Sequence, residues 1–452
     1  MKNILSITLE KFTGVPLEDS PNMPRVIKNT SWLFADQIFR LGAGLLITAW
    51  IARYLGPSQF GLLSYATAFA ALFGSLIGLG LNSIIVRDII RNPSKTNEIL
   101  GSAFILRLIA GIIALAAAVA TICFVRKGDA LTQLLVSLIA AGFIFQAFSV
   151  IDFYFQSQVQ SRYSVYAQNA GFIILGIAKI LLILYRAPLI AFAIAGTAEI
   201  ACTSFFLIIA YRYNRLSIKA WRMKIAVAKE LLRNSWPLIF STVAIIVYMR
   251  IDQIMIGQML GDAPVGIYSA AVRISEAWYF MPMAIAGSVF PIILQIKQSN
   301  EGLYYQKLQN LLDALTLLGI GVAVFVTLTS STLVTLLYGT AYAQSSSILT
   351  LHIWGGVFVC LGVAGNSWFI AENLQIYTCF ITLAGGIANI ALNLVLIPKF
   401  GIQGAALATV ISQILASYLL NIVSTKTRRV FAMQTRSLAF GYLLKHVLRK
   451  NK

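Results

Sequence analysis

The sequence predicts an all-α integral membrane protein of about 12 transmembrane helices, arranged as two parallel six-helix lobes around a central cavity. Three observations predict this fold: an apolar composition, a series of apolar stretches long enough to cross a bilayer, and an internal repeat. Of the 452 residues, 58% are hydrophobic and only 11% are charged, and the mean hydropathy is +0.80. Because a soluble domain has about a quarter of its residues charged, the outer surface of this chain is expected to face lipid.

Stretches of about 20 apolar residues mark the predicted spans, because a helix of that length crosses the hydrocarbon core of a bilayer. The stretches do not alternate apolar and polar residues as barrel strands do, and a helix satisfies its own backbone hydrogen bonds in lipid. The predicted spans are 31–54, 60–83, 99–124, 131–155, 165–185, 188–211, 236–260, 266–294, 308–330, 346–370, 375–397 and 402–423.

The formal net charge of +19 follows the predicted topology. Of the 35 Lys and Arg residues, 25 fall in the termini and the alternate loops that share one side of the membrane, five in the loops of the other side, and five within spans. This positive-inside pattern places both termini in the cytoplasm of a multi-pass protein of the inner (plasma) membrane. The charge is therefore mainly a topology signal, and no nucleic-acid partner is expected.

The internal repeat has an offset of 205 residues, and it is clearest where Leu55–Ala66 matches Leu260–Ala271. In both halves a span ends in Leu-Gly, a short turn follows, and a second glycine opens the next span. Glycine accepts positive φ without strain, so the pattern predicts tight helical hairpins at Gly56–Gly61 and Gly261–Gly266. Both hairpins are predicted on the outer face, and they are expected to approach each other when the cavity faces the cytoplasm.

Each half has six spans, an even number, so both halves enter the membrane from the same side and the repeats are parallel. Between the halves runs a basic linker whose Trp221 is expected to anchor it on the cytoplasmic headgroups. The predicted parts are a cytoplasmic N-terminal segment at 1–29, an N-lobe at 30–211, the cytoplasmic basic linker at 212–235, a C-lobe at 236–424, and a basic cytoplasmic tail at 425–452.

Four segments of the chain carry a family resemblance, and they are Ala52–Gly61, Asp252–Gly257 with Gly266–Ile274, Leu337–Tyr342 and Ile397–Thr409. In this order they resemble polysaccharide and O-antigen flippases of the multidrug/oligosaccharidyl-lipid/polysaccharide (MOP) exporter superfamily. The resemblance runs from about residue 28 to residue 425. It implies a two-lobed, twelve-helix transporter of a polyprenyl-pyrophosphate-linked oligosaccharide, which serves surface polysaccharide biosynthesis. Membrane lipids, a polysaccharide polymerase and a chain-length regulator are the implied partners.

Charged residues inside the predicted spans are the candidate substrate-binding residues. Each costs about 2.5–3.5 kcal/mol at the bilayer centre, so it should face a cavity or a partner. Arginine binds phosphate oxygens in a bidentate geometry, and Arg273 is the predicted main ligand of the lipid pyrophosphate, neutralised by Glu276 while the site is empty. The predicted cavity residues are Asp36, Arg40, Arg250, Asp252, Arg273 and Glu276.

These charges also have a purely structural interpretation. Asp36 with Arg40, and Arg273 with Glu276, are close enough in sequence to neutralise each other. Arg107 and Lys179 are long enough to snorkel to the interface.

Other functions have weaker support in the sequence. There is no nucleotide-binding or dinucleotide-binding motif, no metal-ligand spacing and no catalytic residue pattern, so no cofactor, no metal and no enzymatic activity are expected. The alternative function is a cation-coupled multidrug exporter of the same superfamily, with Asp36, Asp252 and Glu199 as the coupling carboxylates. A third is a membrane scaffold that transports nothing.

Overall fold

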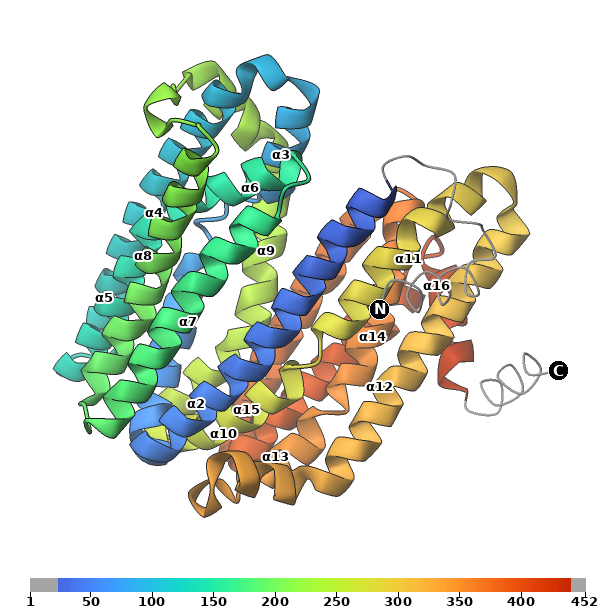
Figure 1. Cartoon of the computed structure of the whole chain (residues 1–452). Coiled ribbons are helices and arrows are strands. Elements are labelled where there is room, and N and C mark those ends of the chain that lie inside the picture. The colour runs from blue at the N-terminus through green and yellow to red at the C-terminus, as the bar shows by residue number, and fades with distance from the viewer. Residues whose placement is uncertain (1–22, 440–452) are drawn as a thin grey trace. The chain divides into compact units, whose positions relative to one another are not determined.

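The computed structural model describes residues 23–439, and every regular element within that range is a helix (Figure 1). The described chain begins with helix α2 (Met23–Gly74) and ends just after α16 (Arg428–Leu438). The predicted N-terminal segment up to residue 22 and the predicted tail from residue 440 lie outside the described residues.

Ten helical segments in the described part of the chain are long and apolar enough to cross a membrane. All twelve predicted spans overlap these ten segments, and the first and the last segments each overlap two of them. The segments are Asp36–Gly74, Pro93–Val125, Ala130–Ser157, Arg162–Leu184, Leu189–Tyr213, Leu238–Met259, Asp262–Ser299, Glu301–Tyr338, Ser345–Ala371 and Gln375–Ile422.

Both double-length segments bend at a glycine. In α2 the backbone is non-helical at Gly56, where φ is 70°, and in α15 (Gln375–Ser417) it is non-helical at Gly401, where φ is 58°. A straight helix of the 43 residues of α15 would be about 65 Å long, roughly twice the thickness of the hydrocarbon core. The glycines stand between the paired predicted spans, and the count of twelve stays a prediction.

Several boundaries differ from the predicted ones. The second predicted span runs to residue 83, but α2 ends at Gly74 and a turn with positive φ at Leu79 and Gly80 leads into the short helix α3 (Asn82–Arg91). The turn is as apolar as a helix, so hydropathy alone does not reveal it. Three other predicted spans consist of two helices each: α5 (Ala130–Phe145) with α6 (Val150–Ser157), α10 (Asp262–Glu276) with α11 (Phe280–Ser299), and α13 (Ser345–His352) with α14 (Gly355–Ala371).

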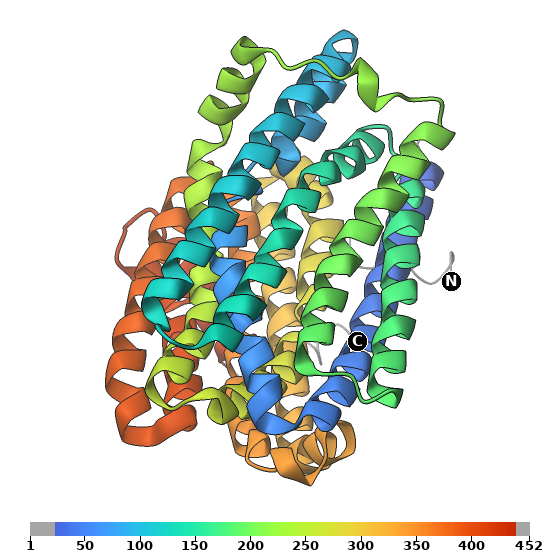
Figure 2. The ribbon, with the colours of Figure 1, turned by 90° about the vertical axis from the view of Figure 1, so that its left-hand side faces the viewer.

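The chain forms two compact units, and Pro24–Ser269 is the first. In it α4 (Thr96–Val125) packs on α5, α5 on α8 (Leu189–Tyr213), and α8 on α7 (Arg162–Leu184), as Figure 2 shows from the side. Helix α9 (Ile225–Met259) packs on α4 in the same unit.

The basic linker between α8 and α9 is held by protein contacts. The Trp221 ring packs on Phe104, and its indole N–H donates to the Tyr211 hydroxyl at 3.1 Å. The Lys224 backbone N–H donates to Ser102 Oγ at 3.1 Å. These contacts with α4 and α8 could not be predicted from the linker sequence, and the headgroup anchoring of Trp221 stays a prediction.

The second unit begins at Ala270. Its long helix α12 (Glu301–Tyr338) packs against α11, α13, α14 and α16, and α14 packs on α15. The predicted lobes 30–211 and 236–424 stay predictions.

Candidate functional site

The predicted pair of Asp36 and Arg40 forms on α2. Arg40 Nε lies 3.4 Å from Asp36 Oδ2, and Arg40 Nη2 donates to Gln168 Oε1 on α7 at 2.6 Å. The second oxygen of Asp36 is buried and has no hydrogen-bond donor among the described residues. Arg40 therefore joins α2 to α7.

Arg107 does not snorkel, and this expectation was wrong. Its side chain is buried, Nη1 donates to Asn82 Oδ1 at 3.3 Å, and the guanidinium lies over the Phe153 ring at 5.3 Å from the centroid. It also interacts electrostatically with Asp152 on α6, which interacts with Arg40 as well. Asp152 thus places one carboxylate near two arginines of different helices.

Sequence reasoning missed Asp152. The residue lies within the predicted span 131–155, and an acid inside a span is the signal that should have selected it. No arginine or lysine lies within four residues of Asp152 in sequence, so no local pattern pointed to a partner. Its basic neighbours, Arg40 and Arg107, come from α2 and α4.

Lys179 also has a partner inside the membrane domain. Its Nζ lies 2.5 Å from Glu199 Oε2, which joins α7 to α8. Snorkelling is therefore the wrong interpretation for Lys179. The pair also bears on Glu199, which the drug-exporter alternative uses as a coupling carboxylate. The positive charge of Lys179 on the neighbouring helix compensates the negative charge of Glu199.

Of the other predicted residues in the first unit, Asp252 is buried on α9 and accepts a hydrogen bond from the Tyr268 hydroxyl at 2.8 Å. Arg250, two residues earlier, is half-buried. In the second unit Arg273 is exposed and interacts electrostatically with Tyr338, whereas Glu276 is half-buried and interacts with Tyr279. The structure thus brings together Asp36 with Arg40, and the roles of Arg250, Asp252, Arg273 and Glu276 stay predictions.

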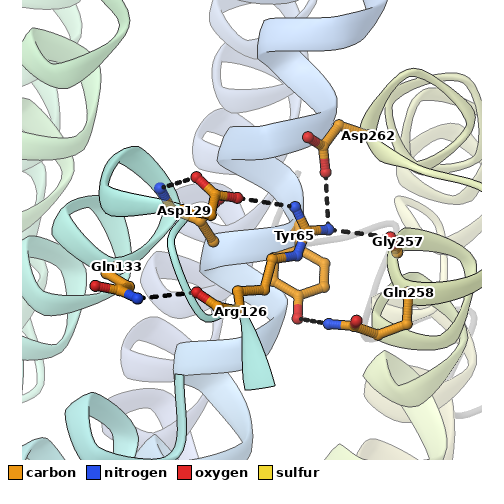
Figure 3. A network of polar contacts seen from close by, with 8 residues as sticks. Tyr65, Arg126, Asp129, Gln133, Gly257, Gln258 and Asp262 are labelled. Atoms are coloured by element: carbon orange, nitrogen blue, oxygen red, sulfur yellow. Dashed lines mark hydrogen bonds and ion pairs between the residues drawn. The ribbon is translucent and has the colours of Figure 1, made fainter. Parts of the chain in front are cut away.

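A second polar cluster of the first unit lies where the chain turns at 125–130 and at 260–262, the end predicted to face outward (Figure 3). Arg126 Nη1 lies 3.2 Å from Asp129 Oδ2, and Nη2 lies 2.9 Å from Asp262 Oδ1 and donates to the Gly257 carbonyl at 3.0 Å. The guanidinium stacks over Tyr65, 4.3 Å from the ring centroid. One arginine therefore binds groups from α2, from the turn before α5, from α9 and from α10.

Two further hydrogen bonds fix the partners of this arginine. Gln258 Nε2 donates to the buried Tyr65 hydroxyl at 2.6 Å, and Gln133 Nε2 donates to the Arg126 carbonyl at 2.8 Å. We call the cluster the hairpin latch, and it consists of Tyr65, Arg126, Asp129, Gly257, Gln258 and Asp262.

The latch lies beside a direct backbone contact between the two glycine hairpins. A Cβ atom on Gly61 would collide with the Asp262 carbonyl, and one on Gly266 would collide with the Pro57 carbonyl. Gly56 and Gly261 have φ of 70° and 93°, as the predicted tight turns require. The structure confirms that the repeated hairpins approach each other, and glycine is the residue that allows it.

The latch is held by charges at neutral pH. Burial alone would lower the pKa of Arg126, but the hydrogen bond and charge of Asp262 outweigh it and raise the pKa. Burial likewise tends to raise the pKa of Asp129, but hydrogen bonds from Thr132 and Arg126 outweigh it and lower the pKa. A lowered carboxylate pKa contributes stability that is present above about pH 4 and is lost only in more acidic solution, so Asp129 should stay ionised between about pH 6 and 8.

Sequence reasoning predicted the hairpin contact but missed Arg126, which counted only as one of five basic residues on the outer side. Its immediate neighbour Lys127 has the same charge and lies over the Phe124 ring instead. The feature that distinguishes Arg126 from Lys127 is its two acidic partners, Asp129 three residues later and Asp262 in the second hairpin.

Comparison with known families and sequences gives three results. The family described as "Polysaccharide biosynthesis protein" matches residues 26–297. The capsular polysaccharide biosynthesis protein CapF of Staphylococcus aureus is 23% identical over 405 residues, which cover 86% of this chain and 97% of that protein. The putative O-antigen transporter of Shigella flexneri is 24% identical over 422 residues, which cover 90% of this chain and 99% of that protein.

Solved structures share the fold. An inward-facing multidrug resistance transporter of the MATE family in the MOP superfamily has a TM-score of 0.72 at 17% identity, and covers 88% of this chain and 95% of its own. The lipid II flippase MurJ in an inward closed conformation has a TM-score of 0.69 at 17% identity, and the match covers 94% of this chain and 93% of MurJ. At this level of identity the likeness establishes the fold alone.

Proposed function

Since this chain belongs to the polysaccharide biosynthesis protein family, as its sequence motifs predicted, we propose that it is a flippase for a lipid-linked oligosaccharide. The observation that carries the proposal is similarity over nearly the whole chain to proteins named for capsular polysaccharide biosynthesis and O-antigen transport. The protein moves its cargo across the cytoplasmic membrane without changing it, and is a transporter and no enzyme. A polysaccharide polymerase and a chain-length regulator are its proposed downstream partners.

In the proposed arrangement the chain crosses the inner membrane twelve times, as two parallel six-helix lobes with both termini in the cytoplasm. The bends at Gly56 and Gly401 support the count, because each lies between two predicted spans that share one double-length helix. The 25-to-5 distribution of Lys and Arg supports the orientation.

The proposed ligands of the lipid pyrophosphate are Arg40, Arg250 and Arg273, with Arg273 the main one. Asp36, Asp252 and Glu276 balance these charges while the site is empty. Arg40 supports this scheme, because Asp36 reaches it at 3.4 Å with a single carboxylate oxygen. A phosphate can approach with two oxygens and carries more charge, so it should displace the carboxylate. Asp152 then keeps Arg40 and Arg107 oriented.

The hairpin latch supplies the other half of the mechanism. A flippase must close one side of its pathway while the other is open. Contact between the hairpins closes the outer end, and release of the cargo outward requires Arg126 to leave Asp262 and the Gly257 carbonyl. The charged contacts stabilise the closed state. When the hairpins separate, water molecules replace these contacts.

The cation-coupled drug exporter remains the alternative, and the contacts of its three carboxylates disfavour it. Glu199 is paired with Lys179, Asp36 with Arg40, and Asp252 accepts a hydrogen bond from Tyr268. A carboxylate that binds and releases a coupling cation needs a less compensated charge than these have.

The orientation predicts the activity of alkaline phosphatase fusions, because this enzyme folds only outside the cytoplasm. Fusions after Gly128 and Gly339 should be active, and fusions after Lys224 and at Lys452 should be inactive. Western blotting of all four controls for expression. The opposite pattern would invert the topology.

Depletion of the protein in its host distinguishes the two functions. The flippase proposal predicts that lipid-linked repeat units accumulate on the cytoplasmic leaflet and surface polysaccharide is lost, with unchanged resistance to cationic drugs. Mass spectrometry of the lipid extract and a drug-sensitivity panel measure both. Sensitivity to drugs with normal surface polysaccharide would favour the exporter instead.

A further inference from the structure

The C-terminal helix α16 is fastened to the second unit by buried polar side chains. Gln434 accepts a hydrogen bond from Asn421 Nδ2 at 2.9 Å and donates to the carbonyls of Leu361 and Ser417 at 3.2 and 2.9 Å. Ser437, also fully buried, donates to Asp313 Oδ1 on α12 at 2.6 Å. Because buried hydrogen bonds are directional, these contacts specify where α16 lies.

Asp313 is a buried acidic residue of this interface. Its side chain is only 6% exposed, and Oδ1 accepts a second hydrogen bond from Gln309 Nε2 at 2.9 Å. The other oxygen, Oδ2, is buried and has no hydrogen-bond partner among the described residues. No lysine, arginine or histidine of the described chain forms an ion pair with it either.

Two amide oxygens beside Asp313 share this condition. Gln309 is 7% exposed and Asn310 is 8% exposed, and in both the side-chain oxygen is buried without a donor among the described residues. The orientation of the Gln309 amide is fixed, because its nitrogen faces Asp313, the Met433 carbonyl at 3.1 Å and Ser437 Oγ at 2.8 Å. Its oxygen must therefore point away from these acceptors.

Positions 309, 310 and 313 fall within about 100° of the circumference of α12, so the three side chains leave the helix on one face. A buried carboxylate without a charge partner is strongly unfavourable, so it takes up a proton or a cation. The two neighbouring amide oxygens, which also have no donor among the described residues, favour the cation, because a protonated carboxyl could donate to only one acceptor. Carboxylate and amide oxygens are the ligands that hard cations prefer.

We infer that Asp313, Gln309 and Asn310 bind a monovalent metal cation, with Na⁺ as its probe, beneath α16. One carboxylate gives too little negative charge for Ca²⁺, whose sites combine six to eight oxygens, and a buried interface does not hold the water shell that Mg²⁺ keeps. The bound ion neutralises Asp313 and so strengthens the attachment of α16 to α12. This inference does not depend on the flippase proposal.

The test uses the purified full chain in detergent, unfolded thermally in NaCl or in choline chloride at equal ionic strength. Na⁺ should raise the midpoint by about 3 °C relative to choline. Asp313→Asn, which keeps the side-chain shape and loses the charge, should abolish the rise. Glu230→Gln is the control, since Glu230 is an exposed carboxylate on α9, away from α16 in sequence, and it should keep the rise.

Direct binding of ²²Na⁺ by the wild-type chain keeps the test decisive if Asp313→Asn fails to fold. About one ion per chain, with trypsin cleavage at Arg428 and Arg436 slowed by Na⁺ and not by choline, supports the site. Equal midpoints in the two salts, together with an Asp313→Asn protein as stable as wild type, would show a protonated Asp313 and overturn the inference. Na⁺ binding and stabilisation that survive unchanged in Asp313→Asn would place the ion elsewhere and overturn it too.

Discussion

A disulfide between cysteines placed at Ser58 and Ala263 is expected to reduce export to below about a tenth of the wild-type level. These positions lie in the turns of the two glycine hairpins, which touch through Gly61, Asp262, Gly266 and Pro57. If outward release requires the hairpins to part, a covalent bond between them holds the outer end closed. Export of lipid-linked oligosaccharide with and without a reductant measures the effect.

The crosslink needs a background in which the native cysteines Cys123, Cys202, Cys360 and Cys379 are replaced by serine. The two single-cysteine variants are the controls, and both should export normally under oxidation. A fully crosslinked protein that exports at the wild-type rate would remove the latch from the transport cycle.

Replacing Arg273 by alanine is expected to reduce export roughly 100-fold while leaving the amount of protein in the membrane unchanged. Two charge-assisted hydrogen bonds to a pyrophosphate are worth about 3 kcal/mol or more, which corresponds to a rate factor of that size. Arg273 is exposed, so its truncation should leave the packing intact. Arg40 would give a less clear result, because it joins α2 to α7 through Gln168.

Arg273→Lys should restore export only in part, because an ammonium group keeps the charge and loses the bidentate geometry. Arg91→Ala is the matched control, since Arg91 is an exposed arginine at the end of α3, and it should export normally. A purely structural pairing of Arg273 with Glu276 predicts the reverse: low abundance of Arg273→Ala, restored when Glu276 is also neutralised. Export and membrane abundance measured on the same cultures separate these cases.

The sequence predicts the helices and the hairpins well, because both are encoded locally. Twenty apolar residues require a helix in lipid, and paired glycines around Pro57 and Pro264 mark turns whose repetition predicted the hairpin contact. Boundaries were less accurate wherever a turn is as apolar as a span, as at Leu79 and Gly80.

The partners of the charged residues were much harder to predict, because they come from helices far apart in the chain. Lys179 and Glu199 are 20 residues apart, and Arg126 and Asp262 are 136 apart, so no local pattern joins them. Asp313 and Ser437 are 124 residues apart, and a serine in a basic tail gives no sign that it is buried against a carboxylate. Sequence reasoning finds which charges need a partner, and packing decides which partner each receives.

The central claim is that this chain alone moves a lipid-linked oligosaccharide across a bilayer. The most direct measurement uses the purified protein in liposomes loaded with a fluorescent polyprenyl-pyrophosphate oligosaccharide, and an added membrane-impermeant reagent that destroys the label in the outer leaflet. Wild type should make nearly all of the label accessible, whereas Arg273→Ala and the Ser58–Ala263 disulfide should leave about half protected, as in protein-free liposomes. Protection of half the label by the wild-type protein would contradict the account.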